Sequence, residues 1–307
     1  MWRCVVLILL SPGWAATLQV EIRNSEVWLI GDGQPKQLTN DGKAKLQAEL
    51  SPSRDRVAYY EQCPQVEHCT PSIIILNLAG DRTGSFQPKR QAIPQAELCT
   101  SILSIAWTGQ NTIASECHIN PSLSEYIETD LSNGQNIRDL LGYDFARSPD
   151  GKNIAHAGWI VHFAPPYAHS NYLQVENTTV YPLPKGRKPV AQKGLAEPPD
   201  VVRNRGLTYF GIHDFQPGLS WAPDSRRIAL IDCTYDWTAE GAGSPDTAGE
   251  ESNRRCSLAI VARNGQFTLH PLTGLSTNEA ARTRLSWTSP HQLWLDTSAG
   301  RKSFDVR

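Results

Sequence analysis

The stretch DFARSPDGKNIAHAG, residues 144–158, holds a tight turn between two apolar runs. Pro149 fixes the backbone angle of the second turn position, the Asp150 side chain can accept a hydrogen bond from a nearby backbone N–H, and Gly151 tolerates the conformation that follows. The stretch therefore predicts an antiparallel hairpin. A single hairpin occurs in many folds. The fold can therefore be inferred only if the sequences that flank this turn recur along the chain.

The flanks occur five times. Each copy has a small residue at the turn and a branched residue five or six positions later, followed in four copies by alanine. The copies are LQAELSPSRDRVAYY, SILSIAWTGQNTIASE, the opening stretch, PGLSWAPDSRRIALID and RLSWTSPHQLWLDT. Their small residues, Ser51, Thr108, Ser148, Ala222 and Thr288, lie 57, 40, 74 and 66 positions apart. This spacing predicts a repeat architecture with insertions of varied size.

Each copy fits the first hairpin of a four-stranded sheet. First strands are expected at 48–50, 103–107, 144–147, 219–221 and 284–287, third strands at 72–78, 124–131, 172–177 and 257–263, and fourth strands near 91–94, 179–183 and 266–270. The run Ile228-Ala229-Leu230-Ile231 is apolar at consecutive positions, which suits a sheet covered on both faces. Helical periodicity is almost absent.

These patterns predict an all-β fold, a β-propeller of five or six four-stranded blades. Strands at 19–23, 26–30 and 35–38 have no preceding turn motif, so we expect them to complete the last blade and close the ring. The long interval from 148 to 222 leaves room for a sixth blade. The alternative is a sandwich of two packed sheets.

The Trp-(Ser/Ala)-Pro-Asp-Gly turn followed by Ile-Ala, with Gln37-Leu38-Thr39 before the first unit, resembles the TolB-type, WD40-like propeller repeat of bacterial exported proteins. The resemblance covers most of the chain after the N-terminal segment, but Asp150-Gly151 is complete in one copy only and Ser225 replaces the glycine in another. It implies a propeller. It implies TolB's own role only weakly, because TolB has an additional N-terminal α/β domain for which this chain has no room.

The first residues have the layout of a signal peptide: Arg3, an apolar run from Val5 to Leu10, a break at 11–13, and small residues at Ala15 and Ala16. We expect residues 1–15 to be a signal peptide and 17–307 a single propeller domain, periplasmic or secreted, with a buried first strand as the alternative for the N-terminus. A formal net charge of -2 without a Lys/Arg block argues against nucleic acid as a partner, and no segment has the length of a membrane span. We expect a monomer.

Six cysteines remain after such a signal, an even number in a compartment where disulfides persist. The expected strands favour three bridges: Cys63 with Cys69, Cys99 with Cys117, and Cys233 with Cys256. The alternative is a metal site using Cys63, His68, Cys69 or Cys117-His118, which lacks the spacing typical of zinc ligands.

Local catalytic motifs are absent: there is no Gly-x-Ser-x-Gly, His-Glu-x-x-His or phosphate-binding Gly-x-x-x-x-Gly-Lys. We therefore predict no catalytic residue, metal or cofactor. Residues 156–214 are the least repeat-like part of the chain, and residues 234–255 are expected to form a long inserted loop. We expect these two segments to form the rim of a ligand-binding mouth. Their candidate residues are His156, Trp159, His162, Tyr167, His169, His213, Asp214 and Trp237. For His156 the favoured interpretation is packing between blades, with the other histidines on a loop.

Trp107, Trp221 and Trp287 could form a sugar-binding platform, but their shared motif position indicates core residues. The leading functional hypothesis is an exported, non-catalytic propeller that binds a protein or peptide partner in the cell envelope. The alternative is a hydrolase or lyase acting on carbohydrate or peptide, which paired carboxylates or clustered histidines at a channel mouth would favour. A third possibility is an accessory domain of a larger envelope assembly.

Overall fold

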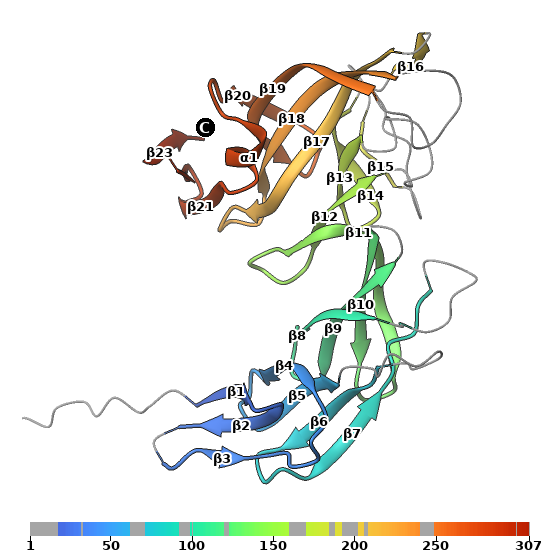
Figure 1. Cartoon of the computed structure of the whole chain (residues 1–307), viewed down its shortest axis with the longest axis vertical. Helices are drawn as coiled ribbons and strands as arrows, with labels where there is room; N and C mark the ends of the chain where they lie inside the picture. Colours follow the sequence, from blue (N-terminus) through green and yellow to red (C-terminus); the bar gives the residue numbers. More distant parts are fainter. Residues whose placement is uncertain are drawn as a thin grey trace, which may run out of the picture.

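The structure is a computed structural model, and it describes residues 18–306 apart from 32, 62–70, 92–98, 100, 120–122, 160–169, 184–187, 192–201, 206–207, 240–248 and 299. The chain is built almost entirely of β-strands, with one short helix, α1 (Thr277–Ala280), among the described residues (Figure 1). The all-β class predicted from the repeat is confirmed.

The strands follow one another as antiparallel meanders. In chain order they are β1 (Gln19–Arg23), β2 (Glu26–Ile30), β3 (Lys36–Gln37), β4 (Lys45–Leu50), β5 (Arg56–Glu61), β6 (Ile73–Asn77), β7 (Arg82–Phe86), β8 (Ile102–Trp107), β9 (Thr112–Ile119), β10 (Leu123–Asp130), β11 (Gln135–Arg147), β12 (Ile154–Trp159), β13 (Asn171–Val175), β14 (Thr178–Tyr181), β15 (Val190–Ala191), β16 (Val202–Arg205), β17 (Thr208–Trp221), β18 (Arg227–Ala239), β19 (Gly249–Ala262), β20 (Phe267–Pro271), β21 (Arg284–Ser289), β22 (Gln292–Thr297) and β23 (Gly300–Asp305).

Hydrogen bonding groups these strands into sheets of neighbours in sequence: β1–β3, β4–β7, β8–β15, β16–β20 and β21–β23. The eight-stranded sheet divides within β11, because residues 135–142 pair with β10 whereas 143–147 pair with β12. Asp144, with a φ of 53°, lies just after this division, in the register shift between Tyr143 and Ala146. The described residues thus form six consecutive meanders.

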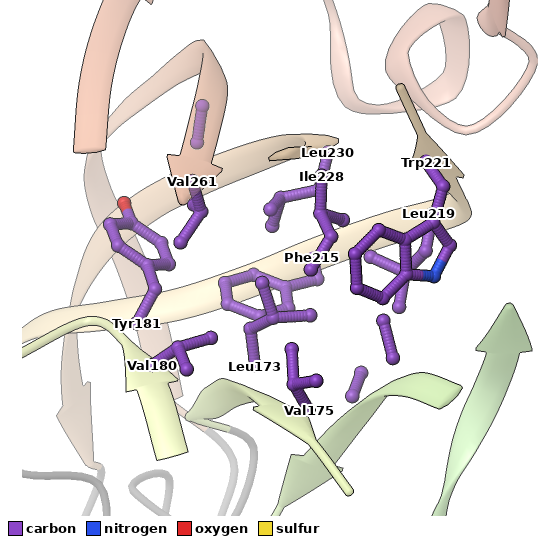
Figure 2. Packing of buried hydrophobic residues seen from close by; sticks show 13 residues of the cluster. Leu173, Val175, Val180, Tyr181, Phe215, Leu219, Trp221, Ile228, Leu230 and Val261 are labelled. Atoms are coloured by element: carbon purple, nitrogen blue, oxygen red, sulfur yellow. The ribbon is translucent and has the colours of Figure 1, made fainter. Parts of the chain in front are cut away.

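An apolar cluster lies between most successive meanders. The central strand β18 contributes to two of them, because Ile228 and Leu230 face the β11–β14 side whereas Ala229 and Ile231 face the β21–β23 side. Figure 2 shows the first cluster, where Leu173 and Val175 meet Phe215, Ile228 and Leu230. The strand β5 alternates in the same way, since Val57 and Tyr59 join the β1–β3 cluster and Ala58 and Tyr60 the β8–β9 cluster. The consecutive apolar runs therefore belong to sheets covered on both faces, as predicted.

The motif tryptophan joins each sheet to the one before it. The indole N–H of Trp107 donates to the carbonyl of Glu49 at 3.1 Å, and that of Trp221 donates to the carbonyl of Ala146 at 2.8 Å. The indole N–H of Trp287 donates to the carbonyl of Ser220 at 3.1 Å. Each acceptor lies two residues before the small residue of the preceding copy, so one inter-sheet hydrogen bond recurs at equivalent positions.

In the other two copies a different residue occupies the tryptophan position. Arg147 reaches the preceding meander by an ion pair with Glu128, at 3.0 Å between Nη1 and Oε1. Leu50 packs with the apolar residues of β1–β3. A further inter-sheet contact comes from Gln47, whose amide accepts from Ile105 N at 2.8 Å and donates to Ile105 O at 2.9 Å.

The expected ring closure is not observed. The strands β1–β3 form a sheet of their own that pairs with none of the described C-terminal strands, and Figure 1 shows β1–β3 and β21–β23 at opposite ends of the molecule. Val20, Val27 and Leu29 instead cover the apolar face of the β4–β7 sheet. Val27 is fully buried in this contact and Val20 and Leu29 are partly buried, so the N-terminal strands cap the β4–β7 sheet and do not complete the last one.

Two of the expected strands also differ from the structure. The fourth strand of the β4–β7 sheet is β7, residues 82–86, and not 91–94. Here β7 follows β6 through a tight turn in which Gly80 has a φ of 98°. The fourth strand after β10 is the first half of β11, which the sequence analysis did not assign.

Two of the three expected disulfides are present. Cys99 is bonded to Cys117 of β9, and Cys233 of β18 is bonded to Cys256, its direct cross-strand neighbour in β19. The expected Cys63–Cys69 bridge lies outside the described residues. The two observed bridges fit a protein that folds in an oxidising compartment. Among the described residues, no helix is long and apolar enough to cross a membrane.

Candidate binding site

Three strands of one sheet are much longer than their counterparts. The strands β17, β18 and β19 have 14, 13 and 14 residues, whereas the equivalent β4, β5 and β6 have 6, 6 and 5. The extra residues continue the pairing after a register shift between Thr234 and Asp236, with Trp237 opposite Glu251 and Ala239 opposite Gly249. We call this part of β17–β19, residues 208–214, 233–239 and 249–256, the strand extension. Figure 1 shows it running beyond the neighbouring sheets.

The strand extension corrects the expectation of a loop at 234–255. Only 240–248 of this segment lies outside the described residues, and most of the rest is paired strand. Its Gly-, Ser- and acid-rich composition is typical of a loop, but the pairing of β18 with β19 continues past the Cys233–Cys256 bridge.

One face of the strand extension carries an ion-paired arginine stacked on an aromatic ring. Arg254 Nη1 lies 2.7 Å from Asp214 Oδ2, and the guanidinium also binds Glu251, with Nη2 donating to Oε2 at 2.8 Å. The same guanidinium lies 4.7 Å from the centre of the Tyr235 ring. The hydrogen bond to Glu251, with the pairing to Asp214, raises the pKa of Arg254. Burial, and secondarily Asp214, raises the pKa of Tyr235 to about 12.

Further aromatic residues lie in the strand extension. Trp237 packs against the buried pair Ile212 and Tyr235, and its indole N–H is buried without a partner among the described residues. Phe210 of β17 is 41% exposed and adds a large apolar side chain to the surface of the strand extension. Tyrosine, tryptophan and arginine dominate the binding energy of protein interfaces. The strand extension therefore presents residue types suited to a protein partner.

The opposite face of β17 holds a buried polar cluster. His213 Nδ1 donates to Asp232 Oδ2 at 2.7 Å, and the hydroxyl of Tyr181 donates to the same oxygen at 2.5 Å. Asp232 is 2% exposed and His213 is 8% exposed. Because Tyr181 belongs to β14 and the other two to β17 and β18, the cluster joins two successive meanders. Neither Asp232 nor Tyr181 carried a sequence signal for this role.

The candidates from the sequence are spread over different elements. His213, Asp214 and Trp237 lie in the strand extension, and His213 and Asp214 point to opposite faces of β17. Trp159 lies in β12. His162, Tyr167 and His169 lie outside the described residues.

His156 lies between neighbouring strands rather than on a surface. It is 1% exposed, its Nε2–H donates to the carbonyl of Glu176 at 2.8 Å, and its ring stacks on Phe145 with centroids 5.4 Å apart. Burial lowers the pKa of His156 to about 4, so its ring is neutral at physiological pH. The burial fits a packing role, the interpretation favoured for His156, but the contacts named here lie within its own β11–β14 meander.

A pair of carboxyl groups lies elsewhere, on β10 and β11. The backbone N–H of Gln91 donates to Glu125 Oε1 at 3.0 Å and to Asp139 Oδ2 at 2.9 Å. Arg90 Nε donates to Glu125 Oε2 at 2.8 Å. Burial, and then Glu125, raises the pKa of Asp139 to about 7. Sequence analysis missed this pair, because 14 residues separate the two carboxyls and only the strand register brings them to one face.

Among the described residues, no group of three or more His, Cys, Asp or Glu side chains is placed to hold a metal ion. A groove of about 530 Å³ opens between β17 and the segment leading into β21, lined by Pro217, Gly218, Leu219, Ser220, Ala281, Arg282, Thr283, Arg284 and Leu285. It lies on the first strands of two successive sheets, at the other end of β17 from the strand extension.

Fold and site together define a chain of consecutive antiparallel meanders with one extended, aromatic-rich sheet. No protein-family model and no curated protein matches the sequence. Similar solved structures include hydrazine synthase of Kuenenia stuttgartiensis (TM-score 0.37, 13% identity, 86% of this chain and 82% of that one) and a eukaryotic initiation factor (TM-score 0.38, 12% identity, 94% and 70%).

TolB from Acinetobacter baumannii is also similar, with a TM-score of 0.32 and 15% identity over 83% of this chain and 63% of that one. The repeat motif led us to expect a likeness to TolB. At these TM-scores and identities the chain is not assigned to the TolB family, and no property of the similar proteins is carried over to it.

Proposed function

We propose that this chain is an exported β-propeller scaffold of six consecutive meanders that binds a protein partner through the strand extension and has no catalytic role. The single observation that carries the proposal is the continuation of β17–β19 beyond the neighbouring sheets, with an exposed Phe210 and an arginine stacked on Tyr235. A paired three-stranded platform holds such side chains in fixed positions, which lowers the entropic cost of binding.

The recurring tryptophan hydrogen bonds support the propeller architecture. They join first strands of successive sheets at equivalent positions, as expected for blades arranged radially around an axis. Export is supported by the two disulfides and by the signal-like residues 1–15, which lie outside the described residues.

The rival function is a hydrolase or lyase with an acid–base pair. The Glu125–Asp139 pair is the observation that favours it, because a carboxyl with a pKa near 7 can donate or accept a proton at neutral pH. Against it, Glu125 is fully buried and its carboxylate is bound by Arg90. The two carboxyl groups also lie on the third and fourth strands of their meander, β10 and β11, and not on the first strand. We therefore rank partner binding first.

Site-specific photocrosslinking in the source cells tests the proposal. A photoreactive phenylalanine analogue at Phe210 is compared with the same analogue at Leu46, which is 53% exposed but lies in β4, outside the strand extension. We expect one dominant protein adduct from position 210 and none from position 46. Adding Arg254→Ala should abolish the adduct. Equal background at both positions would contradict the proposed site.

A further inference from the structure

The last strand of a sheet exposes unpaired backbone groups, and the sheets of this chain protect these edges unequally. The strands β3 and β15 have two residues each, β3 includes Lys36, β7 begins with Arg82, and β23 carries Arg301 and Lys302. Short length and charged side chains are the usual protection of an edge strand. The strand β20 has five residues, FTLHP, and no Lys, Arg, Asp or Glu.

The hydrogen bonds at the two ends of β20 show which of its backbone groups face outward. Ala262 N donates to Gln266 O at 2.7 Å just before the strand, and Leu272 N donates to Cys256 O at 2.9 Å just after it. The register between β19 and β20 continues without a shift from one end to the other. In an antiparallel pair, every second residue exchanges hydrogen bonds with the neighbouring strand.

It follows that Thr268 and His270 are bonded to β19, whereas the N–H and C=O groups of Phe267 and Leu269 point away from it. Within the described part of the chain, these outward groups have no hydrogen-bond partner. Pro271 has no N–H and ends the edge. Two consecutive outward-facing residues therefore offer donors and acceptors in the arrangement that another strand requires.

The side chains of the same two residues form an apolar stripe. Phe267 is 43% exposed and Leu269 is 45% exposed, and they lie on one face because they are two residues apart. Exposed arginines lie beyond both ends of the strand, Arg263 and Arg255, and neither forms an ion pair with a described carboxylate. The edge is apolar in the middle and basic at both ends.

We propose that β20 accepts a strand from a partner protein, so that an extended segment, apolar at alternate positions and acidic at its ends, adds to the β16–β20 sheet. Strand addition to an exposed edge is a recurring mode of peptide recognition. The inference rests on the proposed binding function and places a second contact of the partner on the same sheet. A second copy of this chain fits less well, because antiparallel pairing of β20 with itself would bring the arginines of the two copies together.

Fluorescence anisotropy with a short probe peptide, Val and Thr alternating with Glu at both ends, tests the proposal on the disulfide-bonded full chain. Leu269→Pro removes an outward N–H and keeps the ladder bonds of Thr268 and His270. We expect Leu269→Pro to weaken probe binding at least about tenfold. Leu269→Val, which keeps the N–H and the apolar character, should bind like the wild-type chain. Thermal unfolding of both variants checks that the fold is intact.

Two results would overturn the inference: equal binding by the wild-type chain and Leu269→Pro, or no saturable binding of the probe up to about 1 mM. If the chain forms concentration-dependent dimers and Leu269→Pro abolishes them, the β20 edge pairs with a second copy of the chain. This result would also overturn the inference. Failure of the proposed binding site on the strand extension can be distinguished from failure of this inference. In the former case Arg254→Ala would leave the crosslink at position 210 unchanged, while Leu269→Pro would still lose binding of the probe.

Discussion

Replacing Trp221 by phenylalanine should loosen the contact between two successive sheets. Trp221 is 7% exposed, and its indole N–H donates to Ala146 O at 2.8 Å. Phenylalanine keeps a ring in the apolar cluster but leaves this part-buried carbonyl without its donor. An unsatisfied buried acceptor costs about 1–3 kcal/mol. The cavity left by the smaller ring adds to this, so we expect a loss of about 2–3 kcal/mol in the free energy of unfolding.

Thermal and urea unfolding measure this loss. A domain of this size should show a decrease in Tm of about 4–6 °C. The matched control is Trp294→Phe, because Trp294 stacks on Arg301 and its indole makes no hydrogen bond with a described residue. The control should lose less than about 1 kcal/mol. Equal destabilisation by Trp221→Phe and Trp294→Phe would refute the assignment of an inter-sheet role to the motif tryptophan.

Three further predictions follow from the buried polar groups and the disulfides. The pKa of Asp139 is higher in the folded than in the unfolded chain, so the unfolded chain loses this proton at lower pH. The contribution of Asp139 to stability is therefore present below about pH 4 and is lost as pH rises to about 7. Between these pH values the Tm of Asp139→Asn should fall less than that of the wild-type chain. Cys233→Ser/Cys256→Ser should lower the free energy of unfolding by about 3 kcal/mol in urea titrations, and an unchanged midpoint would contradict a structural bridge. Asp232→Ala removes the acceptor of two buried donors and should cost about 2–3 kcal/mol by the same assay, whereas a neutral result would show that water replaces the carboxylate.

The sequence predicted the fold well where the signal is local. Consecutive apolar residues such as Ile228 and Ala229 indicated a sheet covered on both faces, and they belong to two different clusters. The motif position of Trp221 indicated a core residue, and the structure adds the hydrogen bond that makes that position recur. Turn chemistry located the first hairpin of every meander except β1–β3, because turn residues such as proline and glycine act on the backbone directly.

Features that depend on distant pairing were missed. Glu125 and Asp139 are adjacent only through the β10–β11 register, and Tyr181 meets Asp232 across 51 residues of sequence. The strand extension was expected as a loop, because local composition does not show that β18 and β19 continue to pair beyond Cys233. Ring closure was expected from leftover strands, whereas the β1–β3 apolar residues cover a sheet face instead.

Hydrogen exchange of the indole N–H groups measures the contact between successive sheets most directly. In a ¹⁵N-tryptophan-labelled sample, substitution to phenylalanine assigns the signals of Trp107, Trp221, Trp287 and Trp294. We predict that the first three exchange slowly, as donors to carbonyls of the preceding sheet, and that Trp294 exchanges fast. Fast exchange of all four signals in the folded protein would contradict sheets that pack one behind another through these hydrogen bonds.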